Sequence, residues 1–223
     1  MNLPFLYNRY VRNQRIVNGY KYQFLPFGGG QMNEAYWDPV ILRQGDTFLD
    51  IGANVGGWTI PAAKYYRRVV AFEANPEVAY VLSKNISLNH IGNVEVLPFA
   101  VGEATGEKIL WQYGKSGQDS FLREHAGLHD VGWGTKVKIV ALDSYKLEPN
   151  VIKVDTEGYE LNVLKGAYQT IQRSRPRLAI ETHDPRDVVL IEKMIESYQW
   201  TRIQRPPQPE AEPQTILVGE PTR

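Results

Sequence analysis

The chain has 223 residues, about one and a half times a common domain length, so we expect one domain that carries an extension. It contains no cysteine, which excludes a disulfide-stabilised scaffold, a cysteine-ligated metal site and a thiol nucleophile. Lysine and arginine together number 25 and so do aspartate and glutamate, and this net charge of zero disfavours a domain built mainly to bind nucleic acid.

The predicted elements alternate between short β-branched runs and amphipathic helical patterns. In chain order we expect a strand at 47–51, a helix at 58–66, a strand at 68–73, a helix at 77–89, strands at 94–99 and 151–155, a helix at 161–171, a strand at 177–181, a helix at 188–198 and a last strand at 215–218. Strands separated by helices predict βαβ units, and therefore an α/β fold around a parallel sheet.

Two parts of the chain interrupt this alternation. Residues 107–113 and 136–142 have β-like composition and flank a polar, glycine-rich loop, so we expect them to pair as antiparallel strands at the edge of the sheet. We assign residues 1–45 to an N-terminal arm with a cap helix at 33–42, and residues 46–223 to the domain itself. The arm and the loop at 114–135 are both long and polar, and we expect them to cover a pocket between the carboxyl ends of the strands predicted at 151–155 and 177–181.

No apolar run approaches the ~18 residues that a membrane-spanning helix needs. Residues 1–30 lack the continuous apolar stretch of a secretory signal. We therefore expect a cytoplasmic protein with no membrane span.

The segment FLDIGANVGGWT is the most informative part of the sequence. An apolar strand ends at Asp50, and Gly52, Asn54 and Gly56 allow a tight turn that a ligand can approach closely. An acid at this turn would repel a pyrophosphate, but it suits a ligand with an amino group such as the methionine part of S-adenosylmethionine. The alternative is an ordinary strand-to-helix turn without a ligand.

A second acidic residue follows at the end of the next predicted strand. Glu73 lies 23 residues beyond Asp50, and an acid at about this distance from a glycine-rich turn hydrogen-bonds a ribose diol in nucleotide-binding folds. The alternative is a surface glutamate that favours the positive end of the following helix.

Five motifs together resemble the FkbM-type family of S-adenosylmethionine-dependent class I methyltransferases. They are DIGANVGGWT, VVAFEANPE, FAVGE, VIKVDTEGYELNVLKGA and RLAIETH, and they extend over about residues 45 to 185. The resemblance implies a Rossmann-like, doubly wound sheet of seven strands, parallel except for the last. It also implies methyl transfer from S-adenosylmethionine, usually to a hydroxyl oxygen of a small molecule, a sugar or a glycan.

The resemblance also implies positions for the cofactor. Residues implied at the floor of the cofactor site are Asp50, Gly52, Ala53, Asn54 and Gly56; those at the ribose are Glu73, Ala74 and Asn75; those beside the adenine are Ala100 and Val101; and Asp155 lies beside the sulfonium. Since open α/β sheets bind ligands outside the carboxyl ends of their strands, these residues should converge on one crevice.

Three residues at the ends of the fourth and fifth predicted strands are candidates for catalysis. An alcohol must lose its proton when it is methylated, and His183, beside Glu181 and facing Asp155, is a candidate base. Asp155, Glu181 and His183 are also candidate ligands for Mg²⁺ or Mn²⁺, which would lower the pKa of the hydroxyl. The alternative for the acidic group Asp155, Glu157 and Glu160 is structural, with Asp155 capping a helix and the two glutamates favouring its dipole.

Two other functional classes stay open at this point. An NAD-dependent Rossmann oxidoreductase would bind its cofactor at the same turn, although Asn54 replaces the second glycine of its fingerprint. A non-catalytic module that binds a cofactor or a partner would keep the fold without turnover.

The interleaved arginines and tyrosines of residues 7–22 suit a phosphate chain, but a packed arm explains them equally, so we do not expect nucleic acid as the partner. A homo-oligomer is a further open alternative.

Overall fold

The computed structural model describes residues 13–24, 43–112, 119–121, 133–204 and 214–222. The cap helix expected at 33–42 and most of the loop at 114–135 lie outside these ranges. Within the described ranges, no helix is long and apolar enough to cross a membrane.

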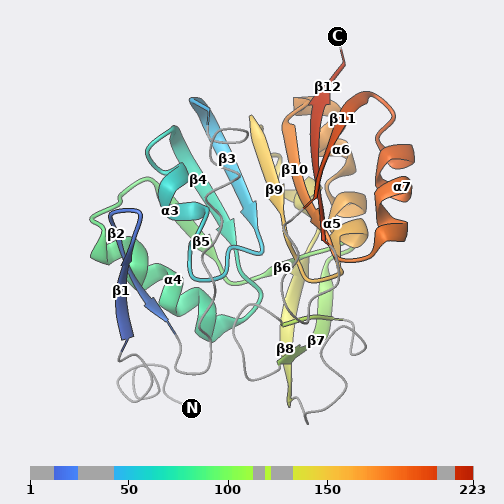
Figure 1. Cartoon of the computed structure of the whole chain (residues 1–223). Coiled ribbons are helices and arrows are strands. Elements are labelled where there is room, and N and C mark those ends of the chain that lie inside the picture. The colour runs from blue at the N-terminus through green and yellow to red at the C-terminus, as the bar shows by residue number, and fades with distance from the viewer. Residues whose placement is uncertain (1–12, 25–42, 113–118, 122–132, 205–213, 223) are drawn as a thin grey trace.

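A seven-stranded sheet forms the centre of the described chain (Figure 1). Its strands are β3 (Gly45–Ile51), β4 (Tyr66–Phe72), β5 (Val94–Leu97), β9 (Val151–Val154), β10 (Arg177–Thr182), β11 (Tyr198–Gln204) and β12 (Thr215–Pro221). Their order across the sheet is β11-β12-β10-β9-β3-β4-β5, and within it β12 alone runs antiparallel to its neighbours. The predicted Rossmann-like sheet is therefore confirmed. The direction of winding reverses between β3 and β9, which is where such sheets bind ligands.

Helices cover both faces of this sheet because successive residues of its buried strands point to opposite faces. The helices are α3 (Thr59–Ala62), α4 (Pro76–Leu88), α5 (Glu160–Gly166), α6 (Tyr168–Ser174) and α7 (Pro185–Met194). Leu49 and Ile51 of β3 pack with the cluster that includes α5, α6 and α7, whereas Phe48 packs on the other face with Trp58 and Ala62. Figure 1 shows α3 and α4 beside β3–β5 and the other three helices beside β10–β12.

The stretches at 107–113 and 136–142 pair with each other as predicted, but not at the edge of the seven-stranded sheet. They form β7 (Gly106–Gln112) and β8 (Trp133–Val140), which are antiparallel as predicted. Together with β6 (Ala100–Val101) they make a separate three-stranded sheet, so their predicted place at the edge is wrong. Pro98 lacks an N–H and follows the last residue of β5, so the strand predicted at 94–99 ends at Leu97 and the chain turns toward β8.

Three helix predictions need correction. The helix predicted at 58–66 ends at Ala62, and Tyr66 begins β4. The helix predicted through Tyr198 ends at Met194, and Tyr198 begins β11, a strand that the sequence pattern did not predict. Pairing with β12 explains the difference, because Trp200 lies opposite Gly219, where a Cβ atom would come within 2.7 Å of the indole ring. The helix predicted at 161–171 is divided at Ala167 into α5 and α6.

A β-hairpin forms the described part of the N-terminal arm. Its strands β1 (Asn13–Val17) and β2 (Tyr20–Phe24) are joined by Asn18 and Gly19, whose positive φ angles of 49° and 82° suit a two-residue hairpin turn. Tyr22 is 1% exposed and packs in a cluster with Val55 and Leu82. The hairpin thus lies against α4, on the β3–β5 half of the molecule (Figure 1), and its Tyr22 belongs to the core of the domain.

Candidate active site

A cleft lies at the carboxyl ends of β3, β4 and β9. It encloses about 670 Å³ of empty space, including its open mouth. Apolar residues such as Phe72 line it, and its acidic lining residues are Glu73, Asp119, Asp155 and Glu157. The cleft is therefore an apolar pocket with acidic groups at defined points, as small-molecule sites commonly are.

The glycine-rich turn after β3 lies directly against the turn after β9. A Cβ atom on Gly52 would come within 1.8 Å of the carbonyl oxygen of Asp155, and the φ of Gly52 is +77°, so no other residue fits here. Asn54 also has a positive φ, of 48°, and its Oδ1 atom is buried without a hydrogen bond in the described structure. Both residues line the cleft, as predicted from the sequence.

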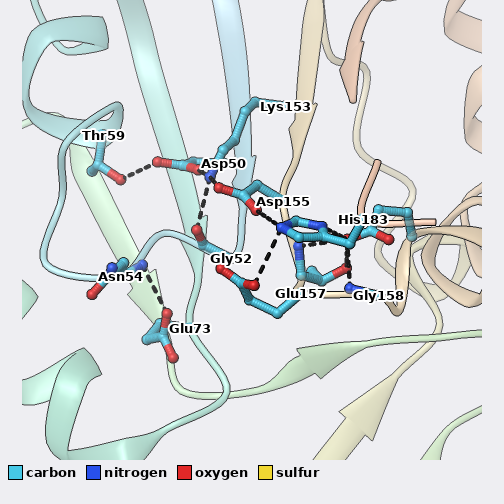
Figure 2. A network of polar contacts seen from close by, with 12 residues as sticks. Asp50, Gly52, Asn54, Thr59, Glu73, Lys153, Asp155, Glu157, Gly158 and His183 are labelled. Carbon is cyan, nitrogen blue, oxygen red and sulfur yellow. Dashed lines mark hydrogen bonds and ion pairs between the residues drawn. The ribbon is translucent and has the colours of Figure 1, made fainter. Parts of the chain in front are cut away.

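Glu73 is held at the end of β4 by two backbone groups. Its Oε2 accepts from the N–H of Asn54 at 2.7 Å (Figure 2). Its Oε1 accepts from the N–H of Asn75 at 2.8 Å. Burial raises the pKa of Glu73 to about 7, against the opposing effect of these two N–H groups, and the nearby Asp119 raises it further. Each carboxylate oxygen keeps lone-pair capacity for a hydroxyl donor from the cleft.

Asp50 does not reach the cleft. It is fully buried, its Oδ2 accepts from the hydroxyl of Thr59 at 2.6 Å, and its Oδ1 lies 3.1 Å from the ammonium of Lys153 (Figure 2). Lys153 is the neighbour of Asp50 on β9, and it also donates to the carbonyl of Gly52 at 2.8 Å. We expected Asp50 to face the amino group of a ligand. It faces the ammonium group of Lys153 instead.

The other predicted cofactor residues divide into two groups. Ala74, Ala100 and Val101 line the cleft. Ala53, Gly56 and Asn75 are not among its lining residues. Asn75 instead caps α4 through its Oδ1 and donates through Nδ2 to Asp119 at 2.7 Å.

Three carboxylates surround His183 at the other end of the cleft (Figure 2). Its Nδ1 lies 3.1 Å from Oε1 of Glu160, and its Nε2 lies 3.2 Å from Oε2 of Glu157 and 3.8 Å from Oδ1 of Asp155. The His183 side chain is 7% exposed and Glu160 is fully buried, whereas 31% of the Glu157 side chain and 25% of the Asp155 side chain stay exposed. Glu157 and Asp155 therefore face the cleft, with His183 behind them.

These contacts change the protonation of the group. Burial alone would lower the pKa of His183, but the hydrogen bond to Glu160 and the charges of Glu157, Glu160 and Asp155 raise it to about 10. Burial raises the pKa of Glu157 to about 8, with His183 opposing and the other acids adding to the effect. Although burial opposes it, the pKa of Glu160 is lowered, chiefly by His183. These contacts favour the imidazolium form of His183, whereas the base predicted from the sequence would act as a neutral imidazole.

The backbone around Glu157 is fixed by contacts from both sides. Glu157 has a φ of +52°, and its carbonyl accepts from the hydroxyl of Ser120 at 2.7 Å. The next residue, Gly158, donates its N–H to Oε1 of Glu160 at 3.0 Å. A non-glycine residue in this conformation is uncommon, and it is typical of positions where a side chain is held for function.

The structure groups Asp155 and His183 with Glu157, not with the expected Glu181. Donor atoms of Asp155, Glu157 and His183 all lie within 4.8 Å of one another in the described chain. Glu181 is 4% exposed and acts on this group through its charge, which raises the pKa of Glu157. The sequence pattern placed Glu157 and Glu160 in one acidic group before a helix and suggested for both a helix-dipole role, not a catalytic one. The Glu-Gly pair just before a helix is the signal that could have drawn attention to Glu157.

The family model of the Methyltransferase FkbM domain matches residues 50–199. This segment contains the residues that line the cleft, and it also contains His183. The chain belongs to the FkbM methyltransferase family. A relative is the hexuronic acid methyltransferase AglP of Haloferax volcanii, 30% identical over 156 residues, which cover 66% of this chain and 61% of that protein. A shorter match, 33% identical over 84 residues and 33% of the chain, is a tRNA (guanine(37)-N(1))-methyltransferase of Danio rerio.

Solved structures share the fold of this FkbM-family chain. Methyltransferase FkbM of Methylobacillus flagellatus superposes with a TM-score of 0.58 at 21% identity, over 83% of this chain and 47% of that one. TYW2 of M. jannaschii, solved with AdoMet, has a TM-score of 0.51 at 15% identity, over 94% of this chain and 85% of that one. The chain thus has a class I methyltransferase fold, and it spans 61% of AglP and 47% of the Methylobacillus protein.

Proposed function

We propose that this methyltransferase transfers the methyl group of S-adenosylmethionine to a hydroxyl oxygen of a sugar or another small-molecule acceptor. The observation that carries the proposal is Glu73, a carboxylate fixed by two backbone N–H groups at the cleft end of β4, beside the glycine turn at Gly52. A carboxylate with free lone pairs at this point suits a ribose diol.

The residues of the cleft fit S-adenosylmethionine. Glu73 would hold the ribose, the apolar wall at Ala100 and Val101 would lie beside the adenine, and the buried, unbonded Oδ1 of Asn54 offers an acceptor to the amino group. When bound, the cofactor supplies a methyl group that is already activated for transfer. Asp50 stays with Lys153 and Thr59 and fixes the turn from behind.

Glu157 is the group that we assign to the acceptor proton. The hydroxyl must lose its proton as the oxygen gains a methyl group, and Glu157 faces the cleft with a pKa raised to about 8. Its ionised form, which increases as pH rises through 8, is a stronger base than an ordinary carboxylate. His183, as an imidazolium behind it, holds the carboxylate of Glu157 in place. Glu160 fixes His183 in turn through Nδ1.

A divalent metal ion is a second way to activate the hydroxyl. Asp155, Glu157 and His183 offer two carboxylates and an imidazole within 4.8 Å, a donor set that suits Mn²⁺ or Mg²⁺, and Glu160 on Nδ1 would orient the imidazole. The proton on His183 competes with a metal, so Mn²⁺ affinity should rise with pH. Electron paramagnetic resonance of added Mn²⁺ tests this site directly. If the protein does not reduce the signal of free Mn²⁺ at pH 8.5, the metal site is excluded and Glu157 acts without a metal.

The sugar-type acceptor has support from one relative, whose name describes a hexuronic acid methyltransferase. Methyl glucoside and methyl glucuronide are therefore the first acceptors to test, with tritiated S-adenosylmethionine as the donor. Incorporation that resists alkaline hydrolysis, as an ether does and a carboxylate ester does not, supports methylation of a hydroxyl. Incorporation only into an amine-bearing or RNA acceptor would contradict it.

Calorimetry tests the cofactor. We expect micromolar affinity for S-adenosylmethionine and S-adenosylhomocysteine and no response to NAD. Glu73→Ala should weaken S-adenosylhomocysteine binding by about 1.5–3 kcal/mol, the value of hydrogen bonds to a charged group. The control is Glu77→Gln, an exposed glutamate in the first turn of α4. NAD binding without a response to S-adenosylhomocysteine would overturn the proposal, and cofactor binding without turnover of any acceptor would favour a non-catalytic module.

A further inference from the structure

The free edge of the N-terminal hairpin is hydrogen-bonded to two asparagine side chains of α4. Lys21 donates its N–H to Oδ1 of Asn89 at 2.9 Å and accepts from Nδ2 of Asn89 at 2.7 Å. Gln23 donates its N–H to Oδ1 of Asn85 at 2.7 Å and accepts from Nδ2 of Asn85 at 3.1 Å. Residues two apart in a strand are separated by about 6.8 Å, and residues four apart in a helix by about 6 Å along its axis. Asparagines four positions apart can therefore each reach one of two alternate residues of β2.

Asn85 differs from Asn89 because it also reaches the cofactor turn. Its Nδ2 donates to the carbonyl of Val55 at 2.9 Å, so both hydrogens of this amide group and its oxygen are in use. Asn85 is fully buried. The further bond of Asn89 stays within α4, to the carbonyl of Asn85 at 2.8 Å.

The carbonyl of Val55 belongs to the turn on which the position of Glu73 depends. Val55 follows Asn54, whose N–H donates to Glu73 at 2.7 Å. On its other side, Gly56 has a φ of +102° and leaves no room for a side chain, because a Cβ atom would come within 2.7 Å of Leu82. A shift of Val55 would therefore move the N–H that holds the Glu73 carboxylate.

We propose that Asn85 is a positioning residue through which the N-terminal hairpin fixes the glycine-rich turn and thereby sets cofactor affinity. The proposal rests on the proposed function for its ligand, S-adenosylhomocysteine. It assigns the hairpin to the cofactor end of the cleft, whereas the sequence had suggested a cover over the acceptor.

The test compares Asn85→Ala with the matched variant Asn89→Ala. Both variants remove hydrogen bonds to β2 and should lower the melting temperature. We expect Asn85→Ala to raise the calorimetric Kd for S-adenosylhomocysteine about tenfold, the equivalent of one hydrogen bond, and Asn89→Ala to change it less than about twofold. Equal shifts in Kd for the two variants, or no shift for a folded Asn85→Ala protein, would overturn the proposal.

A second pair leaves both asparagines intact, in case Asn85→Ala does not fold. Gln23→Pro removes the N–H that binds Asn85, and Lys21→Pro removes the one that binds Asn89, at edge positions where proline is tolerated. We expect a Kd about threefold higher for Gln23→Pro only. Equal values for the two proline variants would contradict the proposal.

Amide hydrogen exchange of residues 53–57 separates this proposal from the proposed function. Without any ligand, exchange there should accelerate in Asn85→Ala and Gln23→Pro and stay unchanged in Asn89→Ala and Lys21→Pro. If the unaltered chain binds no S-adenosylhomocysteine, the proposed function fails, and equal exchange in all four variants would overturn the role of Asn85 independently.

Discussion

The turn after β3 and the turn after β9 meet at Gly52 and Asp155, yet they are held in different ways. At the first turn, backbone N–H groups fix the Glu73 carboxylate. At the second, the position of Glu157 depends on the charge of His183, which itself depends on Glu160. A carboxylate held by backbone N–H groups tolerates changes of side chains that do not position that backbone, whereas a carboxylate held by buried charges depends on each charged side chain around it. We therefore expect substitutions at the second turn to have the larger effects.

The largest effect is expected for Glu157→Gln. Loss of the proton acceptor should lower kcat about 10²–10⁴-fold for a hydroxyl acceptor. Affinity for S-adenosylhomocysteine should change little, since Glu73 is untouched. Methyl transfer from tritiated S-adenosylmethionine gives the rate, and calorimetry gives the affinity. Glu148→Gln, an exposed acid, is the control. A fully active Glu157→Gln enzyme would show that this turn does not move the proton.

Glu160→Gln should have the next largest effect, on stability. Removing one partner of a buried ion pair costs about 3–5 kcal/mol, because the other charge is left without compensation. The control is Glu103→Gln, which breaks an exposed ion pair with Lys165. Lys165 lies on the same helix as Glu160, and loss of this pair should cost about 0–1 kcal/mol. Urea unfolding measures the loss of unfolding free energy in both variants. Equal losses would contradict the expectation that the buried ion pair contributes more to stability than the exposed one.

The pH dependence of stability sharpens the same contrast. The pKa of His183 is raised from its ordinary 6.5 to about 10, so its pairing stabilises the fold fully below pH 6.5 and is lost as pH rises through 10. The difference in unfolding free energy between the unaltered chain and His183→Gln should therefore shrink between pH 7 and pH 10. A difference that is constant over this range would mean that His183 is not an imidazolium.

A smaller effect is expected at the first turn, for the pH dependence of cofactor binding. Because burial raises the pKa of Glu73 to about 7, this carboxyl is mostly protonated at pH 6 and ionised at pH 8. The ionised form accepts more strongly from ribose hydroxyls, so affinity for S-adenosylhomocysteine should increase from pH 6 to pH 8. Calorimetry of Glu73→Gln should show a weaker and flat profile. A sloping profile in this variant would assign the titration to another group.

The smallest effect is expected for Asn75→Ala. Its Oδ1 caps α4, so its loss should destabilise the fold by about 1 kcal/mol in thermal unfolding. Affinity for S-adenosylhomocysteine should stay within about threefold, because Glu73 is held by the backbone N–H of residue 75, which alanine keeps. A much larger loss of affinity would show that the Asn75 side chain, and not only its backbone N–H, holds Glu73.

The sequence predicted the first turn well because its geometry is local. Glycines, a strand end and an acid at a fixed distance determine where Gly52 and Glu73 lie, and the structure places both in the cleft. It did not predict the partner of Asp50, which is set by the register of β9. A lysine in the otherwise apolar run VIKV was the available signal for Lys153.

The second turn could not be predicted because its contacts join distant residues. His183 meets Glu160 across 23 positions, from the end of β10 to the start of α5. Nothing in either segment alone shows that the imidazole would be enclosed by carboxylates and hold its proton. Strand β11 was missed for a similar reason, since its pairing with β12 places Trp200 over Gly219.

The asparagines at the edge of β2 have a consequence for aggregation. An open strand edge offers unpaired N–H and C=O groups to any other extended chain, and proteins commonly protect such edges with charge, proline or a covering element. Here Asn85 and Asn89 occupy the hydrogen-bonding groups of Lys21 and Gln23 as a neighbouring strand would. The same asparagines that hold the hairpin therefore also keep this edge of β2 from recruiting a second molecule by strand addition.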